Sequence, residues 1–167
     1  MRRALSASVL VVATVASVAT SKTPTTTTTG ALRGPSADLA PNLVESFTVD
    51  VLASQSPAGP FDGAVMVSAS ATATGAATVT ATLSVRDAGG TTELATDTVV
   101  LAGGSDDLFL YDDLDAFAGC AAGATCDQTF VLTLHTTGLA SVDWDLEADL
   151  YDLDDIGRTG DLELFLR

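Results

Sequence analysis

ATVTATLSVRDAGG, from Ala77 to Gly90, is the segment from which the structural class of this chain follows. Through Val85, apolar residues alternate one by one with Thr and Ser, so an extended backbone has one apolar side and one polar side. This period of two, together with the β-branched content, is typical of a β-strand with one buried face. The residues Asp87 to Gly90 have the composition of a tight turn, which predicts a hairpin at this point.

Seven other segments from Leu43 onward carry the same alternation, and Gly, Pro, Asp and Ser separate them. They cover residues 43–52, 64–75, 93–103, 107–113, 129–138, 141–152 and 161–167. None of them has the period of an amphipathic helix, so we expect no substantial helix in the mature domain. The pattern predicts one all-β domain over residues 43–167, an antiparallel β-sandwich of about eight strands with an immunoglobulin-like or jelly-roll arrangement. A closed barrel is the alternative.

The composition restricts the classes of partner. The chain has 22 acidic and 7 basic residues and a net charge of -15, so it has no basic patch to neutralise phosphate groups. Nucleic-acid binding and attraction to an anionic membrane are therefore not expected. Apolar residues make up 47% and aromatic residues 5%, which predicts a core of Val, Leu and Ala. The acidity could serve a binding site, or it could be an adaptation of the whole protein to high salt.

The N-terminus has the layout of a secretory signal peptide. Arg2 and Arg3 precede an apolar run, and the small residues Ser17 and Ala19 suit cleavage after Ala19. An uncleaved membrane anchor is the alternative. Residues 1–19 are therefore interpreted as a signal, and residues 20–42, rich in Thr, Pro and Gly, as a flexible linker. We expect a secreted, periplasmic or cell-exterior protein that does not insert into the membrane after cleavage.

Near the C-terminus, the stretch Asp143–Asp155 is highly acidic. Alternation from Ser141 to Leu150 predicts that Trp144 lies in the core with its apolar neighbours. On the opposite side a solvated face is expected to hold Asp143, Asp145, Glu147 and Asp149. The alternative for Trp144 is a stacking platform in a sugar-binding module.

Carboxylates can converge only beyond Leu150, where the alternation ends. Residues 152–163 resemble a calcium-binding EF-hand loop in the spacing of their acids and of Gly157, although Ile156 stands where a ligand is needed. The candidate ligands for Ca²⁺ are Asp152, Asp154, Asp155, Asp161 and Glu163. The acids of residues 106–115 are a second cluster that would strengthen such a site at the same end of the sandwich.

Cys120 and Cys126 are the only cysteines, and small residues separate them. In an exported protein their default state is a disulfide, which would hold the loop before residues 129–138. Zinc binding is the alternative, but two cysteines and the single histidine, His135, are a poor ligand set. No catalytic serine motif or phosphate-binding glycine loop is recognisable in the sequence, so we expect no enzymatic activity.

The short cysteine loop and the segment SVDWDLEADL resemble small exported bacterial β-sandwich proteins, immunoglobulin-like and of uncharacterised function. The resemblance covers about Cys120 to Leu150 and implies an exported β-sandwich without an assigned activity. The leading hypothesis is a secreted non-enzymatic module for binding or presentation at the cell exterior, with an envelope protein or a glycan as partner. A Ca²⁺-dependent carbohydrate-binding module is the alternative, and a hydrolase that uses carboxylates is the third.

Overall fold

The computed structural model describes residues 28–40, 45–56, 63–113, 125–150 and 161–167. Within these ranges the chain is all-β and contains no helix, which confirms the predicted fold class. The strands are β1 (Thr28–Arg33), β2 (Ala37–Leu39), β3 (Ser46–Ser56), β4 (Gly63–Asp87), β5 (Gly90–Asp112), β6 (Cys126–Thr136), β7 (Ala140–Leu150) and β8 (Asp161–Leu166). No helix that could span a membrane occurs in the part of the chain described here.

All strand pairs are antiparallel, and the strand order is β1-β7-β4-β6-β3-β8. β2 also pairs with β7, and β5 pairs with β4 along nearly all of its length. Because β5 occupies one edge of β4, both β7 and β6 must use the other edge. β7 takes residues 63–72 of β4 and β6 takes residues 79–86.

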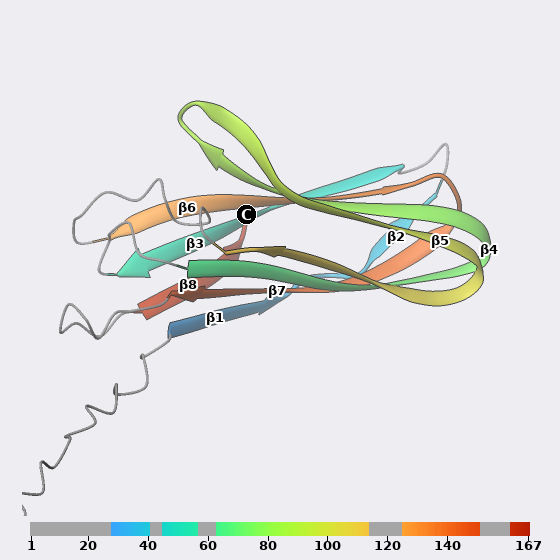
Figure 1. The fold of residues 1–167 in the computed structure, drawn as a ribbon, viewed down its shortest axis with the longest axis horizontal. Coiled ribbons are helices and arrows are strands. Elements are labelled where there is room, and N and C mark those ends of the chain that lie inside the picture. The colour runs from blue at the N-terminus through green and yellow to red at the C-terminus, as the bar shows by residue number, and fades with distance from the viewer. Residues whose placement is uncertain (1–27, 41–44, 57–62, 114–124, 151–160) are drawn as a thin grey trace, which may run out of the picture.

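The β4–β5 ribbon turns back on itself between these two halves and so divides the sheet into two facing layers (Figure 1). The pairing register shifts between Ala73 and Ala76 of β4. On β5 the same point holds Gly103 and Gly104, whose φ angles are 109° and 99°. Residues with a Cβ rarely adopt this backbone conformation, so the glycine pair permits the bend.

We call the two layers A and B. Layer A contains β1, β2, β7, the first half of β4 and the second half of β5. Layer B contains β3, β6, β8 and the remaining halves of β4 and β5. At the side opposite the bend, β1 lies close to β8. A Cβ added at Gly30 of β1 would lie only 2.9 Å from the carbonyl oxygen of Leu162 in β8. The sandwich is therefore nearly closed.

The core fills the space between the layers and consists mainly of Ala, Val and Leu, as the composition predicts. Its largest side chains are Trp144 from layer A and Phe130 from layer B, which are 1% and 0% exposed. The predicted inward side of β7 is confirmed, and its buried residues are Val142, Trp144, Leu146, Ala148 and Leu150.

The ordered domain begins before the position expected from composition. Residues 28–39 lie in the segment interpreted as a flexible linker, yet they form β1 and β2. The reason is tertiary: both strands pair with β7, and Leu39 is fully buried. A Thr- and Gly-rich segment cannot reveal such long-range pairing by its composition.

Asp97 links the two halves of β5 at the open edge of the sandwich. The backbone N–H of Phe109, in layer A, donates to Asp97 Oδ2 at 2.9 Å. The N–H of Thr98, in layer B, donates to Asp97 Oδ1 at 2.8 Å. One carboxylate therefore satisfies an edge N–H in each layer, and hydrogen bonds to a charged acceptor are among the stronger ones in proteins.

We expect Asp97→Ala to lower the free energy of unfolding by about 1.5 kcal/mol, because two backbone donors lose a charged acceptor. Urea unfolding would measure this loss. Asp106→Ala is the matched control on the same strand, since Asp106 accepts a hydrogen bond only from the next residue, Asp107, among the described contacts. That control is expected to stay within about 0.5 kcal/mol of the parent protein. Equal losses in the two variants would contradict a role for Asp97 between the layers.

Candidate binding face

The outer face of layer A brings polar and aromatic side chains from four strands together. The register aligns Arg33 of β1 with Asp145 of β7, Asp145 with Ser68 of β4, and Ser68 with Phe109 of β5. One row further along, Ser70 is aligned with both Asp143 and Asp107. These seven side chains surround an open depression of about 570 Å³ with Ala69 and Leu108 also in its lining. We call this surface the layer A face.

The aromatic part of the layer A face belongs to β5. Phe109 and Tyr111 are 56% and 47% exposed, whereas the alternate residues Leu108 and Leu110 are each 1% exposed. Both rings therefore lie on the outer side of the strand, two residues apart. Large apolar side chains exposed on a strand beside polar groups are typical of contact surfaces.

Two charged groups around the depression have no ion-pair partner among the described residues. Arg33 and Asp145 are register neighbours, yet they form no ion pair, and the ion pair found among the described residues is Arg86–Asp50 in layer B. Asp143 differs, because it accepts a hydrogen bond from the hydroxyl of Ser36. A guanidinium and a carboxylate thus stand side by side, and neither is held by another described side chain.

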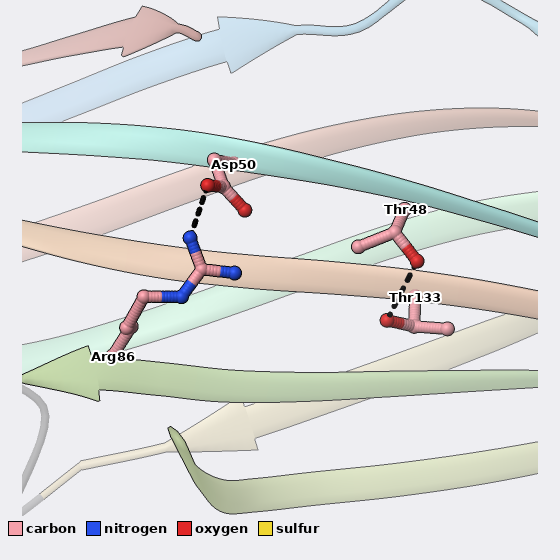
Figure 2. Close-up of polar contacts among 4 residues, drawn as sticks. All are labelled: Thr48, Asp50, Arg86 and Thr133. Atoms are coloured by element: carbon pink, nitrogen blue, oxygen red, sulfur yellow. Dashed lines mark hydrogen bonds and ion pairs between the residues drawn. The ribbon is translucent and has the colours of Figure 1, made fainter. Parts of the chain in front are cut away.

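The outer face of layer B has a different chemistry. Threonines from four adjacent strands form one row across it, in the order Thr48, Thr133, Thr82 and Thr96. Their hydroxyls are hydrogen-bonded in pairs, at 3.3 Å for Thr48–Thr133 and 3.2 Å for Thr82–Thr96. Figure 2 shows the first of these pairs beside the Arg86–Asp50 ion pair, which reaches across β6. On this face the polar side chains bond to one another, so fewer of their donors and acceptors are available to bind a ligand.

His135 lies on this second face and contacts a serine. Its Nδ1 is 3.0 Å from the hydroxyl oxygen of Ser46, and both residues are exposed. No carboxylate among the described residues is hydrogen-bonded to the ring, so a third residue that would orient a catalytic histidine is not in place there. The arrangement is that of a polar cross-strand pair.

The residues predicted to bind Ca²⁺ are only partly described. Asp152, Asp154 and Asp155 lie outside the described residues, while Asp161 and Glu163 are in β8, opposite Ser56 and Ser54. Across the described ranges, no group of three or more His, Cys, Asp or Glu is placed to hold a metal ion. The calcium site therefore stays a prediction.

The predicted disulfide has one end in the described part of the chain. Cys126 begins β6, and Cys120 lies outside the described residues. The pairing of the two cysteines also stays a prediction.

Trp144 is in the core, as predicted, and the alternative that it forms a sugar-stacking platform is wrong, because only 1% of its surface is exposed. Sequence reasoning missed Phe109 and Arg33. The signal for Phe109 was present in the alternation of residues 107–113, but both sides of that strand carry apolar residues, so the outward side was ambiguous. Arg33 had no local signal, because its place depends on the pairing of β1 with β7.

No protein-family model matches the sequence, and no curated protein matches it either. Among solved structures, the chain is similar to infectious bursal disease virus Gt strain, with 12% identity and a TM-score of 0.25. It is also similar to the Gx strain of that virus, with 10% identity and a TM-score of 0.19. The alignments cover 82% and 84% of this chain but 44% of each viral chain. Similarity at this level carries no argument about fold or function.

Proposed function

We propose that this protein is an exported, non-enzymatic module that binds a partner at the cell exterior through the layer A face. The observation that carries the proposal is the depression of about 570 Å³, where the exposed Phe109 lies in the same cross-strand row as Asp145 and Arg33. A depression that joins an apolar ring with a few polar groups is the usual form of a ligand site.

The placement of these groups on strands also supports binding at this face. Strands β4 and β7 are paired on both edges, so the side chains that they carry start from a firmly held backbone. Sites on regular elements hold their geometry better than sites on loops. Export is supported by the N-terminal sequence, where a basic start, an apolar run and a small-residue cleavage site follow one another.

The proposal is tested by cosedimentation of the purified exported protein with washed cells of the organism that produces it. We expect Phe109→Ala and Asp145→Asn each to reduce the bound fraction several-fold, because the first removes the exposed ring from the depression and the second replaces its carboxylate by a neutral amide. Val100→Ala is the control: Val100 is 77% exposed on the same strand but belongs to layer B. Equal binding by all variants would overturn the proposal.

Two further measurements distinguish the alternatives. Loss of cell binding in EDTA, with recovery on adding Ca²⁺, would favour a calcium-dependent module built on residues 152–163. Turnover of glycoside, ester or peptide substrates that disappears in Asp145→Asn would favour a hydrolase. Either result would replace the proposed function.

A further inference from the structure

We infer that the layer A face binds an uncharged carbohydrate chain, with the ring of Phe109 as the stacking platform and without a metal ion. The inference rests on the proposed function and specifies its ligand. Three observations support it: the exposed rings of β5, the Arg33 and Asp145 side chains, which form no ion pair with any described residue, and the mixture of charges around the depression.

The rings supply the apolar contact that a sugar requires. Phe109 and Tyr111 lie on the same side of β5, and residues two apart on a strand are about 7 Å from each other. Carbohydrate rings have C–H faces that pack on aromatic faces, while their hydroxyls project sideways toward polar groups. Phe109 borders the depression directly, and Tyr111 extends the aromatic surface along the same edge.

The neighbouring polar groups complement hydroxyls. An ionised carboxylate such as that of Asp145 accepts hydrogen bonds but donates none, and the guanidinium of Arg33 donates hydrogen bonds but accepts none. Ser68, in the same row as Asp145, can do both. A hydroxyl group is at once donor and acceptor, so adjacent hydroxyls on a sugar can satisfy the carboxylate and the guanidinium together.

The charges around the depression disfavour anionic ligands, and Arg33 opposes a cationic group at Asp145. Asp107, Asp143 and Asp145 would repel a phosphate, a sulfate or a uronic acid. Arg33 stands beside Asp145 and would oppose an ammonium or guanidinium group placed against that carboxylate. An uncharged polyhydroxylated ligand meets neither repulsion. The volume of about 570 Å³ lies within the range of about 300–1,000 Å³ that is typical of ligand sites.

Calorimetric titration of the exported protein in EDTA tests the inference. The probes are four uncharged oligosaccharide series (gluco-, xylo-, manno- and N-acetylchito-), an oligogalacturonate as anionic chain and a glucosamine oligomer as cationic chain. We expect binding of at least one uncharged series and weaker binding of both charged chains.

Phe109→Leu keeps an apolar side chain but removes the ring, and should weaken binding about tenfold. Phe109→Tyr should remain within about twofold, and Val100→Ala should bind like the parent protein.

Absence of binding to all four uncharged series would overturn the inference, as would tighter binding of a charged chain or equal affinities of Phe109→Leu and the parent. Each variant is first checked by its melting temperature, and Phe109→Tyr shows whether a ring alone restores binding. If cells still bind through Phe109 and Asp145 while no oligosaccharide does, the proposed function stands and the ligand class fails. If cell binding is insensitive to both residues, the proposed function itself fails.

Discussion

Trp144→Ala is expected to lower the free energy of unfolding by about 3–5 kcal/mol, the range for truncating a large buried aromatic side chain. Trp144 is 1% exposed and is the largest fully buried side chain of the described core, whose other members are mostly Ala, Val and Leu. Side chains of that size cannot collapse far into the space left by an indole, so most of the cavity would persist. Urea or guanidinium unfolding monitored by circular dichroism would measure the loss.

Trp144→Phe is the informative companion variant. The indole Nε1 of Trp144 is buried and has no hydrogen-bond partner in the described part of the chain. Replacement by Phe removes this unsatisfied donor while it keeps an aromatic ring in the core, so we expect a loss of only about 1 kcal/mol. A loss as large as that of the Ala variant would contradict this expectation.

Gly34→Ala is expected to cost about 3 kcal/mol, at the upper end of the range for overpacked cores. A Cβ at this position would lie 1.9 Å from Cζ2, 2.1 Å from Cε2 and 2.4 Å from Cη2 of Trp144. The backbone cannot easily retreat, because the N–H of Gly34 donates to the carbonyl oxygen of Trp144 at 3.2 Å. Gly75→Ala is the control: nothing lies within 4 Å of its added Cβ, and a change within about 0.5 kcal/mol is expected.

A double-mutant cycle identifies the indole as the obstacle. In the Trp144→Ala background the ring is gone, so Gly34→Ala should cost at least about 1 kcal/mol less than it does in the parent protein. Additive losses would place the strain elsewhere, for example in the backbone conformation of residues 34–36. Both single variants and the double variant can be compared by the same denaturant unfolding measurement.

The sequence was most informative where polar and apolar residues alternate. In β7, carboxylates alternate with Val, Trp and Leu, so only one side can be buried, and the structure buries that side. In residues 107–113 both sides carry apolar residues, and alternation alone does not choose between them. The structure places Leu108 and Leu110 inside and the rings of Phe109 and Tyr111 outside, which is the choice that creates the candidate site.

Long-range pairing explains the remaining differences. Residues 64–75 and 77–87 look like two strands separated at Gly75, but they form the single strand β4, whose pairing with β5 resumes beyond the bend. Residues 28–39 have the composition of a linker, but β7 offers them a free edge. Arg33 reaches the layer A face only through the pairing of β1 with β7. Neither effect can be read from a local pattern, because each depends on a strand far along the chain.

The pairing of β1 with β7 also sets an order of assembly. The hydroxyl of Thr29 donates a hydrogen bond to the carboxylate of Asp149, a residue 120 positions further along the chain. The β4–β5 hairpin, in contrast, joins neighbours and can form as soon as its turn is made. Contacts between distant segments require closure of a large loop and are therefore slow. The first strands can dock only after β7, which ends at Leu150, has emerged. For a protein proposed to cross a membrane, this late docking would delay tight folding until β7 has been translocated.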